Sequence, residues 1–499
     1  MKKYLFTTIA TITLLSTVTI SCSDEFVDPA PAYSIDSENY FNSKEEYNNA
    51  LIATYDLLQS SYVNVLLGEI ASDNTLAGGE SPTDVIGFQQ VDDMIHTQTN
   101  SNIKDIWNWM FAGVQRANYI LEFQNKTDFE GKTQIIAETR FLRAYYQFEL
   151  VKWFGGIPMK GDARFKLGDE TKIPRSSVQE VYASIESDLT FAAANLSPIA
   201  SQKGRVTKGA ALALLGKTYL YQNKFTQAAT ALQSVINSGS YSLVADYNSM
   251  FELAGENGTE SVFEVQYTDV EGAGFGCLQC SEGNVAVGFS GVRGYDGPLF
   301  TSGFSFNIPT QESANAFESG DKRKDVAILD INAWALANAA YDNGNGIKFG
   351  KGNEDTGFFN RKYLPRKRPK EAAGDLNLTN PNNYRAIRYA DVLLMAAEAY
   401  NRGAIDDGKA REYLNLVRRR AFGDNNHDVT VGGASLTDLI LKERRVELFG
   451  EGHRFFDLVR TGNAVGTIPG FTKDKNELFP LPIEEIQFAN GNWKQNPGY

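Results

Sequence analysis

Residues 209–241 read GAALALLGKTYLYQNKFTQAATALQSVINSGSY and predict two antiparallel helices joined by a short turn. Gly216 and Ala228 are small, so the two helices can approach each other closely, and Leu215 and Leu232 fill the space around them. A helix pair of this kind is a structural unit without chemistry of its own. The residues that set its spacing are Leu212, Leu215, Gly216, Tyr219, Ala228, Leu232 and Val235.

A second copy of this spacing occurs in residues 392–422, VLLMAAEAYNRGAIDDGKAREYLNLVRRRAF, with one more residue in the turn. Two such copies are typical of tetratricopeptide repeats, in which helix pairs stack into a continuous array. We therefore expect a mainly α protein, in which tetratricopeptide-like helix pairs form a helical platform. The corresponding residues are Leu393, Ala396, Ala397, Tyr400, Ala410, Leu414 and Val417.

Helical periodicity also extends towards the N-terminus from the first pair. Ser43 followed by Glu46 has the pattern of a capping box at the start of one helix. Gly155 is expected to end another helix, because glycine readily adopts the backbone conformation found after a helix. Besides the helix that starts after Ser43, helices are predicted at about residues 106–123 and 134–154, and a further one begins at Ser176 or Ser177 and runs to Asn195.

Three polar stretches lack this periodicity: residues 70–105, 255–308 and 342–383. The second is rich in glycine and contains two short strand-like runs, at residues 261–267 and 285–289. Long loops on a rigid scaffold are where binding residues are commonly placed. We therefore expect these stretches to supply the ligand contacts.

The composition is that of a globular protein, with 42% hydrophobic and 22% charged residues. At about 150 residues per domain the length would correspond to about three domains, but the repeats favour one helical platform instead. We expect helical regions at residues 43–254 and 384–499, with a loop-rich ligand-binding insertion containing short strands at residues 255–383.

The net charge argues against a nucleic-acid partner. The chain has 61 acidic and 48 basic side chains, a formal net charge of −13. Binding to a phosphate backbone requires a basic face, and no basic face dominates this sequence. Aromatic residues make up 12% of the chain, so some rings are available for roles outside the core.

The N-terminus has the features of a lipoprotein signal peptide over residues 1–21. Two lysines precede an apolar stretch that is too short and too rich in threonine for a membrane span. The sequence TISC at residues 19–22 resembles the lipobox of bacterial lipoproteins, and the acidic residues after it resemble the surface-export signal of Bacteroidetes lipoproteins. Cys22 is thus the predicted lipidation site, followed by a leader over residues 22–42. The alternative is an ordinary secretory peptide.

Cys277 and Cys280 form a C-x-x-C motif. A structural zinc site needs four ligands, and the chain has neither a second C-x-x-C motif nor clustered histidines. A local disulfide and two unpaired thiols are therefore the alternatives. The Asp and Asn residues at positions 342–360 lack a recognisable calcium-loop spacing, which leaves calcium binding open. We predict neither a cofactor nor a metal site.

Several long motifs, in a fixed order, carry a family resemblance. AETRFLRAYY at residues 137–146 with WFGGIP at 153–158, and IRYADVLLMAAEA at 387–399, resemble the signature of the SusD/RagB family of outer-membrane lipoproteins. The C-terminal part of the chain continues the resemblance with ERRVEL at 443–448, EGHRFFDL at 451–458, LFPLP at 478–482 and QNPGY at 495–499.

The resemblance implies a lipid-anchored protein of the outer membrane that faces the cell exterior. Such a protein captures an oligosaccharide, caps a SusC-type TonB-dependent transporter and performs no covalent chemistry, so we expect no enzyme. Two alternatives remain: the same architecture binding peptides, and a non-catalytic tetratricopeptide interaction scaffold. The family's fold, a helical bundle with tetratricopeptide units and a loop-rich ligand face, agrees with the repeats.

Some charged residues of these motifs could also be interpreted as catalytic. Glu443 and Glu447 share one helical face and, with Asp457, could form a carboxylate pair for glycoside hydrolysis. They alternate with arginines, however, so we expect structural ion pairs. His453 is expected to make a structural hydrogen bond, because no nucleophile lies at a recognisable spacing from it. The arginines at positions 418–420 are expected to be ion-paired or solvated.

A sugar ring packs its C–H face on an aromatic plane, and planar polar groups bind its hydroxyls. Trp107, Trp109 and Trp153 lie within amphipathic helices and are assigned to the core. Tyr295 and Asp296, on a glycine-flanked loop, form the preferred pair of ligand contacts, although Tyr295 could instead pack inwards from a β-turn. The other predicted ligand contacts are Trp334, whose alternative is core packing in a short helix at residues 333–340, and Asn74, Phe88 and Arg361.

Overall fold

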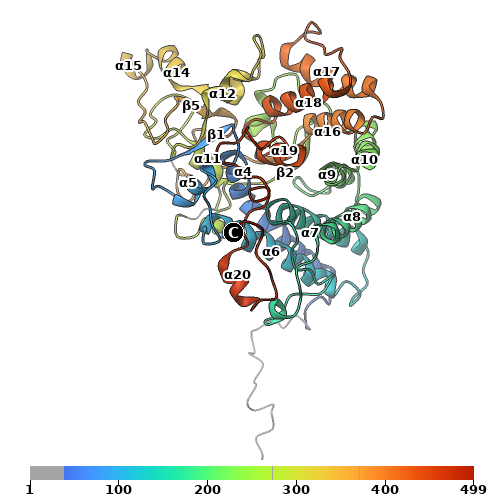
Figure 1. Cartoon of the computed structure of the whole chain (residues 1–499). Coiled ribbons are helices and arrows are strands. Elements are labelled where there is room, and N and C mark those ends of the chain that lie inside the picture. Colours follow the sequence, from blue (N-terminus) through green and yellow to red (C-terminus); the bar gives the residue numbers. More distant parts are fainter. Residues whose placement is uncertain (1–38, 272–273, 370) are drawn as a thin grey trace, which may run out of the picture.

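The computed structural model describes residues 39–271, 274–369 and 371–499, and this part of the chain is mainly α-helical (Figure 1). The predicted fold class is therefore confirmed. The long helices are α3 (Lys44–Asp56), α4 (Ser61–Ile70), α6 (Ser101–Glu122), α7 (Lys132–Phe154), α8 (Val178–Asn195), α9 (Lys208–Tyr221), α10 (Phe225–Asn237), α16 (Tyr389–Arg402), α17 (Asp407–Phe422) and α18 (Gly433–Glu447).

Short helices and strands, joined by turns and loops, make up the rest of the regular structure. The short helices are α5 (Ile86–Asp92), α11 (Val285–Ser290), α12 (Gln311–Asn315), α13 (Lys324–Ala327), α14 (Ile331–Ala337), α15 (Tyr341–Gly344), α19 (Arg454–Thr461) and α20 (Ile483–Phe488). The strands are β1 (Thr75–Gly78), β2 (Ser261–Val265), β3 (Phe306–Pro309), β4 (Ile328–Asp330), β5 (Phe358–Asn360) and β6 (Tyr384–Arg388).

The long helices form one continuous array. Each helix from α6 to α10 packs against the next, and α10 packs against α16, which in turn contacts α17 and α18. Helices α7 to α10 and then α16 and α17 follow one another up the right-hand side of Figure 1. The two predicted repeats, α9–α10 and α16–α17, are thus neighbours in space, although residues 238–388 separate them in the chain.

Local sequence signals determine where several of these helices begin and end. Ser43 caps α3 by accepting a hydrogen bond from the backbone N–H of Glu46. Ser177 and Glu180 form a reciprocal capping box at the start of α8. Gly155, with a φ of 72°, ends α7, because this left-handed region is accessible to glycine at little cost. The predicted helix starts and stops are therefore correct to within a few residues.

The segment between α10 and α16 contains most of the strands, which pair in three two-stranded antiparallel sheets. In one sheet β1 pairs with β3, so Thr75 lies opposite Pro309. In another, β4 pairs with β5, and Ile328 lies opposite Asn360. In the third, β2 pairs with β6, the strand that leads directly into α16. The β1–β3 pairing joins the first two polar stretches predicted from the sequence, and β5 of the third packs against β3.

One predicted strand is a helix. Residues 285–289, interpreted as a strand-like run, form α11, whose first turn is capped by the Asn284 side chain. A short apolar run fits a buried strand and a buried helix equally well by periodicity. The helix is closely packed against the rest of the chain, since a Cβ atom at Gly288 would lie 1.6 Å from the carbonyl oxygen of Asn377.

The main hydrophobic core combines residues from both ends of the chain. Trp153 in α7 packs against Phe455, Phe456 and Phe479, with ring centroids 6.0, 4.7 and 4.8 Å away. Trp107, Trp153 and Trp493 are buried and Trp109 is half-buried, in agreement with their assignment to the core. A second, smaller core lies within the insertion and comprises Val292, Tyr295, Phe300, Ile308, Leu329, Ile331, Phe359 and Leu364.

Cys277 and Cys280 are joined by a disulfide, which selects one of the two alternatives. Within the described ranges, no helix combines the length and the apolar character that crossing a membrane requires. The predicted signal peptide at residues 1–21 and the predicted lipidation site Cys22 lie outside the described residues.

The close approach of α9 and α10 gives a stability prediction. A Cβ atom at Gly216 would lie 2.5 Å from Cγ of Leu232, so we expect Gly216→Val to lower the free energy of unfolding by about 1–3 kcal/mol through overpacking. Urea unfolding followed by circular dichroism measures this effect. The control Gln227→Val places the same β-branched residue at an exposed position of α10; equal losses in the two variants would contradict the packing argument.

Candidate functional site

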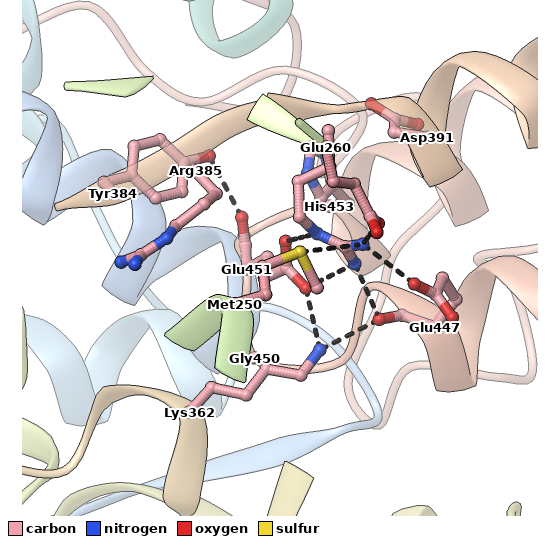
Figure 2. Close-up of polar contacts among 12 residues, drawn as sticks. Met250, Glu260, Lys362, Tyr384, Arg385, Asp391, Glu447, Gly450, Glu451 and His453 are labelled. Atoms are coloured by element: carbon pink, nitrogen blue, oxygen red, sulfur yellow. Dashed lines mark hydrogen bonds and ion pairs between the residues drawn. The ribbon is translucent and has the colours of Figure 1, made fainter. Parts of the chain in front are cut away.

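A buried charge cluster lies where α18 ends, and Figure 2 shows part of it, around Glu447, Glu451 and Lys362. The Glu447 carboxylate lies 2.8 Å from the guanidinium groups of Arg388 and Arg323 and 2.6 Å from that of Arg420. Burial alone would raise the pKa of Glu447, but these three cations lower it well below its ordinary value. Glu447 is therefore ionised, and its carboxylate forms ion pairs with arginines from three other parts of the chain.

Glu451 extends the cluster towards the insertion. Its carboxylate lies 2.7 Å from Nζ of Lys362 and 2.8 Å from Nε of Arg388, and Lys362 also donates to the Glu447 carbonyl at 2.9 Å. Burial lowers the pKa of Lys362 to about 8, although the charge of Glu451 opposes this shift. The pKa of Glu451 is lowered because Arg388 and Lys362 outweigh the effect of burial. Both groups are therefore charged at neutral pH, and the pair ties the insertion to the helical platform.

A second group of buried ion pairs links α16, α18 and α19. Arg444 lies 2.7 Å from Asp391 and 2.8 Å from Asp457. Arg460 lies 2.7 Å from Asp457 and 2.6 Å from Glu398. Each acid of this group contacts at least one arginine from another helix, so the helices are held in one relative position.

His453 is buried beside these charges. Its Nδ1 lies 3.3 Å from Nζ of Lys217. Burial, together with the charge of Lys217, lowers the pKa of His453 to about 3. The imidazole is therefore neutral at physiological pH, and the predicted structural hydrogen bond is confirmed. A residue with 6% exposure and this pKa is unsuited to act as a general base on a bound ligand.

The ion-pair role predicted for the motif carboxylates is confirmed. Glu443 contacts Arg418 at 2.8 Å, and Arg454 contacts Asp73 at 2.8 Å. Arg419 pairs with Asp428, so every residue of the run 418–420 has an acidic partner. Glu443 and Glu447 are fully buried and engaged by arginines, which leaves neither of them able to reach a glycosidic bond.

Four of the predicted ligand contacts come together around α14. The Trp334 indole N–H donates to the hydroxyl of Tyr295 at 2.9 Å, and the Arg361 guanidinium lies 5.5 Å from the centre of the Trp334 ring. Asp296, next to Tyr295 in the chain, accepts a 3.5 Å hydrogen bond from the Tyr341 hydroxyl. We call Asp296, Trp334, Tyr341 and Arg361 the α14 surface.

The members of this group differ in exposure. Tyr295 belongs to the small core of the insertion, and its hydroxyl donates to the Pro298 carbonyl at 2.8 Å. Its ring therefore faces inwards, which is the alternative that the sequence left open for Tyr295. Tyr295 supports Trp334 from the side of the small core. Trp334 and Arg361 are half-buried, and Asp296 is exposed. Trp334 lies in α14, which starts two residues before the predicted position because the Asp330 side chain caps it.

Asn74 and Phe88 have no surface to offer a ligand in this structure. Asn74 is fully buried, accepts a hydrogen bond from Arg445 at 2.9 Å and donates to Glu69 at 3.3 Å. Phe88 is 1% exposed and packs against Phe289 and Phe306. Both residues support the loops from inside, and direct contact with a ligand would require the loops to open.

Sequence reasoning missed other aromatic residues at the surface of the insertion. Tyr341 contacts Asp296, and the Lys367 ammonium lies 5.7 Å from its ring centre. Phe275, next to the disulfide, is 62% exposed and packs against Phe304 with ring centroids 5.4 Å apart. The signal for Phe275 was its position in a glycine-rich segment beside Cys277, which suggests exposure.

Two family models match the chain. A model described as the SusD family matches residues 245–499, and one described as "Starch-binding associating with outer membrane" matches residues 25–220. The chain belongs to the SusD family. The first match contains Glu447, Arg388 and Asp457, so the buried charge cluster lies within the residues that the SusD family model matches, and the second contains α3 to α8 and nearly all of α9.

Solved structures and curated relatives agree with this assignment. A structure described as a laminarin binding SusD-like protein is 33% identical, with a TM-score of 0.83 and coverage of 92% of this chain and 100% of that chain. Surface glycan-binding protein A from Bacteroides thetaiotaomicron, in complex with laminarihexaose, is 26% identical over 91% of this chain and 99% of that chain, with a TM-score of 0.80. A SusD-like protein of Formosa agariphila is 28% identical over the full length of both chains.

The charge cluster gives a second stability prediction. Glu447→Gln removes the charge that Arg388, Arg323 and Arg420 share, and we expect a loss of about 3–5 kcal/mol in the free energy of unfolding, because buried cations are left uncompensated. Denaturant unfolding measures the loss. The control Asp428→Asn removes the partner of the exposed Arg419 and should cost at most about 1 kcal/mol; similar losses in both variants would contradict a special role for Glu447.

The buried histidine gives a pH prediction. The unfolded chain protonates a histidine near pH 6.5, whereas folded His453 stays neutral to about pH 3. The unfolded state therefore binds the additional proton as pH falls, and His453 destabilises the fold by about 2 kcal/mol between pH 6.5 and 5. We expect the stability advantage of the wild type over His453→Gln to shrink by this amount between pH 7 and 5.

The comparison must be a difference between two proteins, because other buried groups titrate in the opposite sense. Burial raises the pKa of Glu69 and of Asp92 to about 7, so these carboxyls stabilise the fold as pH falls towards 5. Glu69 and Asp92 are unchanged in both proteins, and their effect cancels in the difference. A gap between wild type and His453→Gln that is constant from pH 7 to 5 would show that the prediction is wrong.

Proposed function

We propose that this protein is a cell-surface lipoprotein that captures an oligosaccharide and caps a SusC-type TonB-dependent transporter for uptake, without covalent chemistry. The observation that carries this proposal is the likeness, over more than nine-tenths of the chain, to a laminarin binding SusD-like protein. The glycan-bound relative, with laminarihexaose, adds the ligand class. The buried, arginine-paired state of the motif carboxylates supports a binding role over hydrolysis.

The ligand in this proposal is a neutral glucan of the laminarin type, and residues 255–383 form the region that binds it. The α14 surface offers the chemistry that a sugar needs: the half-exposed ring of Trp334, the exposed carboxylate of Asp296 and the guanidinium of Arg361. The hydrogen bond from Trp334 to Tyr295 fixes the orientation of the indole. A ring held in place before binding loses little entropy when the ligand arrives.

The anchor in this proposal is the lipidated Cys22. Acyl chains on this cysteine would hold the protein at the outer membrane, facing the cell exterior, at about 0.8 kcal/mol per buried methylene. The match to a model described as associating with the outer membrane supports this location. A formal net charge of −13 is compatible with a tethered surface protein.

The α14 surface gives a binding prediction. We expect Trp334→Ala to weaken the binding of laminarihexaose at least about tenfold, equivalent to 1.4 kcal/mol, because a stacking plane is lost. Isothermal titration calorimetry measures the affinity, and an unchanged melting temperature excludes unfolding. Asp296→Ala should weaken binding by a smaller factor, because one hydrogen-bond acceptor is lost at an exposed position.

Leu336→Ala is the matched control for Trp334→Ala. Leu336 is 81% exposed in the same helix, and residues two positions apart do not share a helical face. Equal loss in the two variants would contradict the α14 surface as the binding site. Binding of an oligopeptide panel with no binding of laminarihexaose would favour the peptide-binding alternative, and binding of neither ligand would favour the interaction scaffold.

A further inference from the structure

A hollow lined by aromatic side chains lies outside the insertion. It is bounded by α6, by the segment at residues 158–170, and by α20 with the C-terminal segment, and its volume is about 410 Å³. This is within the range of small-molecule sites. In Figure 1, α20 lies at the bottom of the molecule, whereas α14 and α15 lie at the top. The hollow is therefore distinct from the α14 surface, and we call it the α6–α20 hollow.

Four aromatic rings line the α6–α20 hollow. Trp107 and Trp493, with ring centroids 6.2 Å apart, are 2% and 6% exposed and form its floor. Phe111, 4.5 Å from Trp107, and Phe165 are half-buried and form its walls. These rings come from three separate segments, so the aromatic lining exists only in the folded chain.

Hydrogen bonds fix two of the segments that carry these rings. The Trp493 indole N–H donates to the Ile173 carbonyl at 2.8 Å. The Gln115 amide pairs with both backbone groups of Phe165, each at 2.9 Å. The Trp493 indole and the backbone that carries Phe165 are thus held in place before any ligand arrives, which lowers the entropy cost of binding.

The polar side of the α6–α20 hollow is acidic. Glu485 is partly buried, which raises the pKa of its carboxyl, and the Trp107 indole is its hydrogen-bonding partner. In the described parts of the chain, no ion pair involves Glu485, and the nearby cation Lys104 is paired with Glu484 at 2.7 Å. Among the residues that line the hollow, Glu170 and Glu485 are acidic and none is basic. A carboxylate in this setting has acceptor capacity that a hydroxyl donor would satisfy.

We propose that the α6–α20 hollow is a second sugar site, in which a neutral sugar residue packs on Phe111 and Phe165 and donates a hydroxyl hydrogen bond to Glu485. Aromatic walls on one side and a carboxylate on the other match the apolar face and the hydroxyl rim of a sugar ring. The two acids disfavour sulfated and uronic-acid sugars. The proposal rests on the proposed function, since both sites would serve one class of glycan.

A second site changes what the protein can capture. A long glucan chain that occupies both sites is held by two contacts, and the second contact forms at the high effective concentration set by the first. A short oligosaccharide occupies one site at a time. We therefore infer that a polymer binds more tightly than a hexasaccharide and that the gain depends on the α6–α20 hollow.

The test uses the full-length Trp334→Ala protein, in which the α14 surface is disabled. We expect laminarihexaose to produce a saturable change in tryptophan fluorescence, because Trp107 and Trp493 line the α6–α20 hollow. Adding Phe165→Ala or Glu485→Gln should weaken this residual binding at least tenfold. In the otherwise wild-type protein, the same two substitutions should weaken binding of polymeric laminarin severalfold, with hexasaccharide affinity at the α14 surface unchanged.

Phe488→Ala is the matched control, because Phe488 lies in α20 with Glu485, is 63% exposed and does not line the hollow. It should leave all of these measurements unchanged. The second site is overturned, with the proposed function intact, if the wild type binds laminarihexaose but Trp334→Ala shows no fluorescence change. A change saturated by tetramethylammonium and not by laminarihexaose would overturn the assignment to sugar, and a wild type that binds no glucan would overturn the proposed function as well.

Discussion

The Glu447 carboxylate is the point where separate parts of this protein are held together. Arg388 reaches it from the junction of β6 and α16, Arg420 from α17 and Arg323 from the segment before α13. Buried charges are tolerated only when they are compensated, so these elements can adopt few other arrangements. Through Glu451, the same cluster also holds Lys362 of the insertion. The position of the loops on the platform therefore depends on this set of ion pairs.

The helical array and the insertion have different roles, since the array is a scaffold and the insertion carries the loops. The packing of α10 against α16 lets the array continue while the chain leaves it for about 150 residues and returns. The segment between α10 and α16 forms a region with its own small core, in which Tyr295 and Phe300 support Trp334. The platform thus acts as a scaffold for the loops, and its own far end, between α6 and α20, has an aromatic lining suited to the same class of ligand.

Sequence reasoning was accurate for features that depend on neighbouring residues. Helix spacing, the Ser43 cap of α3 and the end of α7 at Gly155 follow from local stereochemistry and were predicted. Tyr295, Trp334 and Arg361 were all predicted as ligand contacts, and the structure places them next to one another. Their exposure was not predictable: Tyr295 faces the small core, and Asn74 is covered partly by Arg445, 371 positions away in the chain. The burial of a loop side chain is decided by such distant partners.

The sequence by itself determined the fold class, the family resemblance and the structural role of the motif charges, because helical periodicity and alternation of acids with arginines are visible in one dimension. Only the tertiary structure decided that residues 285–289 form a helix and that Phe88 is covered. It also placed Trp107 and Trp493 beside Glu485 at a common hollow. The reason is physical: exposure, close packing and desolvation of a carboxylate arise from contacts between segments far apart in the chain, and local patterns carry no information about those contacts.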